Sequence, residues 1–168
     1  GEKDNLVMMA SQGLNEGVIG NIRLRTGAGL VGLVAEKAEP LRLQDALSHK
    51  GFVYFEGSGE EKYPKFMGVP IIFQRKILGV LVVQRAQIDF DSDDEAFLTT
   101  LATQLANAIT HARNSGQFSQ SLGKESGSIS CTVQGIAGAP GLNMGNAVVI
   151  NHGVNLHNVP HKKVTGAD

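Results

Sequence analysis

The chain has 168 residues, of which 42% are hydrophobic and 18% charged, enough for one ordinary domain with an appendage. Fifteen basic and sixteen acidic side chains leave a formal net charge of -1, which argues against a nucleic-acid-binding module and against a polybasic membrane anchor. The single cysteine, Cys131, excludes an internal disulfide. No apolar run approaches the ~20 residues of a membrane span, and no secretory signal pattern opens the chain. We therefore expect a cytoplasmic protein that binds neither nucleic acid nor membrane.

Short apolar segments separated by turns predict the first elements. Residues 6–10 form an apolar run that favours a strand, and the alternation across residues 22–25 favours a second one. The spacing of apolar residues after Gly29 predicts a short helix that ends before Pro40. Residues 41–43 then predict a brief strand.

The segment from Gly27 to Gly32 spells G-x-G-x-x-G directly before that helix. A dinucleotide-binding fingerprint needs a strand before it and a βαβ pattern after it, and neither is visible. We therefore interpret the glycines as a tight turn that lets the helix pack closely.

A β-hairpin is the next predicted element, with strands at residues 66–73 and 77–84 joined by a polar tip at residues 74–76. Both strands carry apolar residues on both faces, which indicates that they are covered on two sides or lie centrally in a sheet. Pro70 cannot donate to the ladder and predicts a bulge or a locally unpaired edge.

A long helix is predicted over residues 92–113. Ser92 and Glu95 fit a capping box, in which the serine accepts from an early backbone N–H and the glutamate reaches back. The expected buried stripe has helical spacing. It comprises Phe97, Leu98, Leu101, Leu105, Ala108, Ile109 and Ala112.

The rest of the chain divides into two parts. Residues 114–128 are rich in Ser, Gly and Gln and are typical of a linker. Residues 129–168 are too poor in large apolar groups to form a stable domain alone, although residues 147–150 predict a good strand.

Motifs for catalysis and metal binding are weak. His157 and His161 have i, i+4 spacing, but Pro160 interrupts the helix that such ligands need. Ser48-His49 and Cys131 have no visible partners for a nucleophilic triad. The acidic residues around position 93 are explained by helix capping.

The most suggestive site is the loop of residues 45–66, which mixes aromatic and polar side chains over ~20 residues. It could form the wall of a pocket or a lid that packs on the sheet and binds nothing. From their positions at strand ends and beside the loop, four residues are candidate polar contacts to a ligand. They are Arg42, His49, Tyr54 and Gln84.

The ordered elements resemble those of a GAF domain. The resemblance rests on Gly29-Leu30-Val31-Gly32-Leu33-Val34-Ala35, Glu39-Pro40-Leu41, Asp45-Ala46, Phe66-Met67-Gly68-Val69-Pro70-Ile71-Ile72, Leu78-Gly79-Val80-Leu81-Val82-Val83-Gln84 and the acidic-capped helix. The string from Ser48 to Tyr54, followed by Met67-Gly68-Val69-Pro70, is similar more narrowly to the GAF domain of the nitrogen-branch phosphoenolpyruvate–protein phosphotransferases. Residues 135–147 resemble the opening of the enzyme-I-type N-terminal domain.

The resemblance implies an α+β fold with an antiparallel sheet flanked by helices, followed by a linker and a strand. It divides the chain into a GAF domain at 1–113, a linker at 114–128 and the start of the enzyme-I-type domain at 129–168. It also implies a sensor of nitrogen status, with glutamine or 2-oxoglutarate as candidate effectors. The alternative is a dimerisation module that senses nothing, with the helix stripe packed against its own copy.

Two departures from the family pattern matter. A GAF domain normally begins with a helix and a strand before the one expected at residues 6–10, and we recognise neither in this sequence. We therefore hypothesise that residues 147–150, or a partner chain, pair with the sheet. The second departure is that none of the five histidines lies in the phospho-accepting motif of the family. For the full-length enzyme, the resemblance implies Mg²⁺ as a cofactor, a phosphocarrier protein as a partner and a homodimeric assembly. We expect that this chain by itself binds no cofactor and is inactive as a transferase.

Overall fold

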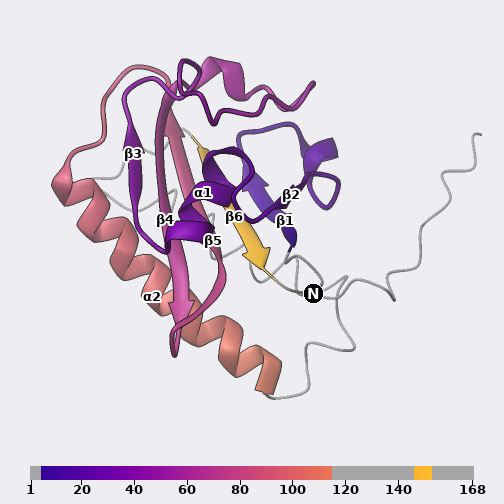
Figure 1. Cartoon of the computed structure of the whole chain (residues 1–168), viewed down its shortest axis with the longest axis vertical. Helices are drawn as coiled ribbons and strands as arrows, with labels where there is room; N and C mark the ends of the chain where they lie inside the picture. The colour runs from indigo at the N-terminus through magenta and orange to yellow at the C-terminus, as the bar shows by residue number, and fades with distance from the viewer. Residues whose placement is uncertain (1–4, 115–145, 153–168) are drawn as a thin grey trace, which may run out of the picture.

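The computed structural model describes residues 5–114 and 146–152 and has an α+β architecture, as expected (Figure 1). One antiparallel sheet has the strand order β2-β1-β6-β5-β4-β3. In chain order the elements are β1 (Asn5–Gln12), the 3-10 helix η1 (Glu16–Val18), β2 (Arg23–Arg25), α1 (Gly29–Lys37), β3 (Leu41–Leu43), the 3-10 helix η2 (Glu60–Lys62), β4 (Lys65–Phe73), β5 (Lys76–Arg85), α2 (Ser92–Asn114) and β6 (Asn146–His152). No helix in the described ranges is long and apolar enough to cross a membrane.

Strand β6 lies at the centre of the sheet, between β1 and β5, and is antiparallel to both. Its register places Val148 opposite Val82 of β5 and opposite Ser11 of β1. This confirms the hypothesis that residues 147–150 pair with the sheet. The proposed linker beyond Asn114 and the remainder of the proposed second domain lie outside the described residues.

Each face of the sheet carries its own core, because successive side chains of a strand point to opposite sides. Val80 and Val82 pack with α1, whereas Leu81 and Val83 pack with α2. The two helices therefore cover opposite faces (Figure 1). Both faces of the hairpin are apolar because each is covered by a helix, as predicted.

The hairpin turn is one residue shorter than predicted, since only Gln74 and Arg75 separate β4 from β5. Both residues have positive φ, at 46° and 66°, as a two-residue turn of this hand requires. Pro70 lies beside a bulge at Ile71 and Ile72, and in a part of β4 with which β3 does not pair. Both outcomes expected for this proline are therefore present.

The glycine-rich segment before α1 is a tight turn with close packing, as interpreted. Gly27 and Gly29 have φ of 84° and 68°, a region that favours glycine. A Cβ on Gly32 would lie 2.6 Å from the carbonyl oxygen of Arg25. The glycines therefore serve the backbone of the turn and not a dinucleotide.

The capping box at the start of α2 lies one residue earlier than predicted. The Oδ1 atom of Asp91 accepts hydrogen bonds from the N–H groups of Asp93 and Asp94, both at 2.9 Å. The Asp94 carboxylate reaches back to the N–H of Asp91 at 3.2 Å. Asp91 is therefore the cap, Ser92 is the first helical residue, and Glu95 has a different role.

The buried stripe of α2 is also rotated relative to the prediction. Leu98, Leu105 and Ile109 are buried as expected, but Phe97 is 40% exposed and Ala108 is exposed. Ala102 and Ala106 are buried in their place. Their small side chains let the helix approach the sheet closely, which a bulky residue at either position would prevent.

Because of this rotation, substitutions at the neighbouring positions 97 and 98 should lower the free energy of unfolding by very different amounts. Leu98→Ala should lower the free energy of unfolding by about 3 kcal/mol, because it opens a cavity beneath α2. Phe97→Ala should cost about 1 kcal/mol or less, because its ring is partly in solvent. Urea denaturation followed by circular dichroism measures both, and an equal cost for the two variants would contradict the observed orientation of α2.

Candidate functional site

A pocket lies on the α1 face of the sheet, between α1, the loop that joins β3 to β4, and the strands beneath them. Its empty volume is about 310 Å³, part of which is open solvent at its mouth. Its walls come from β2, α1, the loop and the hairpin. The lining residues are Leu24, Gly29, Leu30, Val31, Phe52, Val53, Phe55, Glu60, Phe66 and Gln84.

The loop wall of the pocket is tied down at several points. At its base, the N–H of Ala46 donates to the carbonyl oxygen of Pro64 at 2.7 Å, which brings the loop ends together. Farther along, Asn15 donates from its side chain to Gly57 and from its backbone to Ser58. Ser58 is fully buried. These hydrogen bonds hold the loop in place as a wall of the pocket. They favour the interpretation of this segment as a pocket wall over a lid that only packs on the sheet.

Two polar side chains interrupt the apolar lining. Gln84 is 4% exposed and projects from β5 on the same side as Val80 and Val82, which brings its amide to the pocket. Glu60 begins η2, and its Oε1 accepts a hydrogen bond from the N–H of Phe55 at 3.2 Å. Burial raises the pKa of the Glu60 carboxyl, against the opposing effect of its hydrogen bonds with Phe55 and Ser58.

The four candidate contacts predicted from the sequence do not converge. Gln84 alone lines the pocket. Tyr54 is 51% exposed. The Nδ1 atom of His49 accepts a hydrogen bond from the N–H of Gly51, within a turn of the loop.

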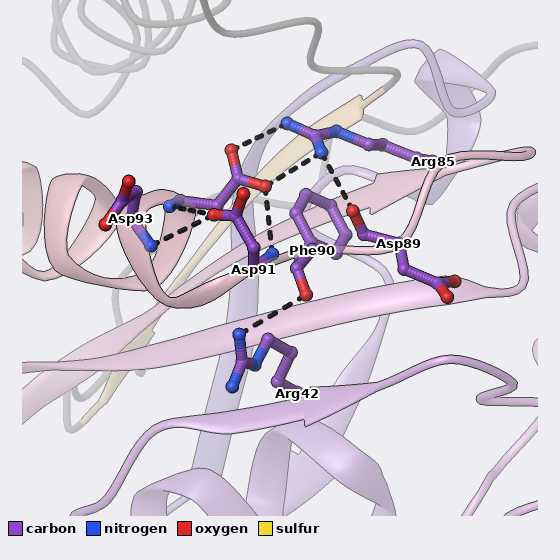
Figure 2. Close-up of polar contacts among 7 residues, drawn as sticks. Arg42, Arg85, Asp89, Phe90, Asp91 and Asp93 are labelled. Carbon is purple, nitrogen blue, oxygen red and sulfur yellow. Dashed lines mark hydrogen bonds and ion pairs between the residues drawn. The ribbon is translucent and has the colours of Figure 1, made fainter.

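Arg42 lies on the opposite face of the sheet, so its expected place beside the pocket is wrong. Its neighbours Leu41 and Leu43 pack with the α1 core, and strand alternation sends Arg42 toward α2. There it donates to the carbonyl oxygen of Phe90 at 3.3 Å (Figure 2). It also forms an ion pair with Glu95 at 3.5 Å. The residue that sequence reasoning missed is Glu60, because a charged side chain in a polar loop carries no signal of burial.

The lining supports binding and offers little for catalysis. Glu60 is the one titratable side chain among the lining residues, and none of those ten residues is a serine, cysteine, lysine or histidine. Elsewhere in the loop, Ser48 donates to Asp45 at 2.5 Å and is not aimed at His49. Within the described ranges, no cluster of three or more His, Cys, Asp or Glu side chains could hold a metal ion.

A second polar site lies on the other face of the sheet, where β5 meets the start of α2. Both terminal nitrogens of Arg85 donate to the Asp94 carboxylate, at 2.9 and 3.0 Å (Figure 2). The guanidinium also lies 4.2 Å from the centre of the Phe90 ring. The Arg85 and Asp94 side chains are only 10% and 15% exposed, so this two-point ion pair is largely shielded from water.

Comparison with known proteins identifies close relatives of this arrangement. The family model for the GAF domain matches residues 2–109. The chain is 41% identical over 114 residues to the phosphoenolpyruvate-dependent phosphotransferase system protein of Escherichia coli (strain K12), and equally to that of Salmonella typhimurium (strain LT2). This match covers 67% of the chain but only 15% of each of these curated relatives.

Solved structures agree with the sequence comparison. The GAF domain from a phosphoenolpyruvate-protein phosphotransferase of Coxiella burnetii is 42% identical, with a TM-score of 0.62 over 68% of this chain and 74% of that one. The corresponding Acinetobacter GAF domain is 37% identical, with a TM-score of 0.56 over 68% of this chain and 73% of that one.

The shielded ion pair predicts a pH-dependent loss of stability in Asp94→Asn. Removing the carboxylate takes away the negative charge and the two hydrogen bonds that Asp94 supplies to the Arg85 guanidinium, and it should cost on the order of 3 kcal/mol at neutral pH. Burial opposes ionisation of Asp94, but hydrogen bonds from Arg85 and Asp91 and the charges of Arg85 and Arg42 outweigh it and lower the pKa of Asp94. The stabilisation should therefore be complete above about pH 4, the ordinary pKa of an aspartate, and be lost as the pH falls through the lowered pKa.

Thermal or urea unfolding of both proteins between acid and neutral pH measures this difference. Asp93→Asn is the matched control, since Asp93 is an exposed carboxylate in the same helical turn. A cost for Asp94→Asn no greater than that of the control would mean that the ion pair contributes nothing specific.

Proposed function

The chain belongs to the GAF domain family, and from that premise we propose that it is the regulatory, small-molecule-sensing domain of a phosphoenolpyruvate–protein phosphotransferase, reporting nitrogen status to the phosphotransferase part. The single observation that carries the proposal is the pocket beneath the β3–β4 loop, an apolar hollow with two polar side chains at its wall. The candidate effectors are glutamine and 2-oxoglutarate.

The route from the pocket to the rest of the protein follows β5. Gln84 lines the pocket, and the next residue, Arg85, holds the start of α2 on the opposite face. A ligand that displaces Gln84 would alter the backbone that also positions Arg85, and α2 leads toward the segment proposed to connect the two domains. The ligand can shift this equilibrium only by binding one arrangement more tightly than the other.

In the alternative, a dimerisation module, the apolar stripe of α2 would contact a second copy, but that stripe already packs against the sheet. Leu105, at the middle of the expected contact stripe, is 4% exposed and packs in the core between α2 and the sheet. A Leu105→Glu variant would place a charge in that core and unfold the domain, so it is unsuitable as a test of dimerisation. This alternative therefore needs a different face of α2.

An amide NMR titration of the folded chain with glutamine and with 2-oxoglutarate tests the proposal. We expect saturable shifts with at least one of the two, centred on the residues that line the pocket. Gln84→Ala should weaken that binding by about tenfold, the value of a typical buried hydrogen bond, because its amide faces the ligand.

Arg42→Ala is the matched control, since Arg42 lies on the other face of the sheet, and its affinity should stay within about twofold of the parent. Absence of saturable shifts with either metabolite at millimolar concentration would contradict the sensor. Shifts confined to the α2 face would move the site elsewhere.

A further inference from the structure

Strand β6 reaches the centre of the sheet from far along the chain. Its neighbours in the sheet are β1 and β5, and residues 86–145, which include α2, separate it from the nearer of them. Backbone pairing runs along both of its edges, from Leu6 to Gln12 on β1 and from Gly79 to Gln84 on β5 (Figure 1). The slot between β1 and β5 is therefore a binding site for a strand, and a distant segment of the chain fills it.

Without β6 the sheet divides into two parts. One part contains β1 and β2, and the other contains β3, β4 and β5. The second part has a core of its own on the α2 face, because every buried residue of that core except Ala10 and Phe90 belongs to β4, β5 or α2. The hairpin and α2 therefore keep their mutual contact when β6 leaves.

The core on the α1 face, in contrast, takes buried residues from both parts of the sheet. They include Leu6, Met8 and Leu24 from one part, and Phe66, Val80 and Val82 from the other.

The pocket spans the same division. Leu24 lines it from β2, whereas Phe66 and Gln84 line it from β4 and β5. Because paired strands lie about 4.8 Å apart, β6 sets the distance between β1 and β5 at about 10 Å. This pairing extends as far as Gln84, which lies opposite Asn146 at the start of β6. Withdrawal of β6 would therefore separate the walls of the pocket.

We infer that insertion of β6 into the sheet and binding of a small molecule in the pocket are coupled, so that each favours the other. The inference rests on the proposed sensing function and adds a second route out of the pocket, besides α2. Such coupling is reciprocal: a ligand that binds only the assembled pocket holds β6 in its slot, and the inserted strand raises the affinity for that ligand by the same factor. Since β6 belongs to the segment proposed as the start of the next domain, the strand carries the state of the pocket to that segment.

Hydrogen–deuterium exchange of the full chain tests the coupling without any substitution. The probe is L-glutamine or 2-oxoglutarate, whichever gives saturable shifts in the NMR titration. Amides of β6 should exchange faster than those of the β4–β5 hairpin, because β6 withdraws while the hairpin stays folded. The probe at about ten times its Kd should slow exchange from β6 about tenfold, the factor that linkage gives for a ligand that binds only the inserted form. Residues 110–114 at the end of α2 are the internal control, and their exchange should not change.

A proline in β6 tests the reverse direction. Val148→Pro removes a backbone N–H from a strand that is paired on both edges. It should weaken binding of the same probe by about tenfold or more, because the apparent affinity falls with the fraction of molecules in which β6 is inserted. Val154→Pro places the same ring beyond the end of β6 and should leave the affinity within about twofold. Far-UV circular dichroism of both variants measures whether α2 is retained.

The outcomes separate the inference from the function on which it rests. Exchange from β6 at the rate of the hairpin would overturn the inference, because β6 would then leave only on global unfolding. Saturable binding that leaves exchange from β6 unchanged would also overturn it and leave the sensor intact. A Val148→Pro variant that retains α2 and binds as tightly as Val154→Pro would do the same. Absence of binding by both candidate effectors would contradict the sensor and, with it, the coupling.

Discussion

The two-point ion pair between Arg85 and Asp94 fixes where α2 begins and how it lies on the sheet. Asp94 uses the same carboxylate to bind Arg85 and to accept from the N–H of Asp91, so the helix cap and the strand–helix contact depend on one side chain. Once the first turn is held there, the buried stripe of α2 meets β4 and β5 in a single orientation. The core on this face follows from that contact.

The alternation of β5 connects this ion pair with the pocket. Successive residues of a strand face opposite sides, so Gln84 reaches the pocket while Arg85 reaches the helix. The polar groups of the pocket are a neutral amide and a partly buried carboxylate, which suits recognition of a small molecule. β5 thus connects the pocket on one face of the sheet with the start of α2 on the other.

Sequence patterns predicted the hairpin and α2 because continuous apolar runs and helical periodicity are local properties. The pairing of residues 147–150 with the sheet was hypothesised from the family resemblance, which left one strand of the sheet unaccounted for. The capping residue was wrong because Asp91 to Glu95 contains two overlapping capping boxes, and the Arg85 contact favours the earlier one. Phe97 was assigned to the core by its helical spacing, whereas Ala102 and Ala106 are the residues that pack there. Arg42 was misplaced because strand position alone did not decide its face, and Glu60 was missed because its burial depends on how the loop folds over the sheet.

The central claim is that a ligand in the pocket on one face of the sheet changes the stability of the first turn of α2 on the other face. Hydrogen–deuterium exchange of the full chain, with and without saturating glutamine, measures this directly at the capped amides of Asp93 and Asp94. The account predicts that glutamine changes protection both in the pocket loop and at these two amides, and that Asp94→Asn abolishes the second change only. Protection of the pocket loop with no change in the first turn of α2 would contradict it.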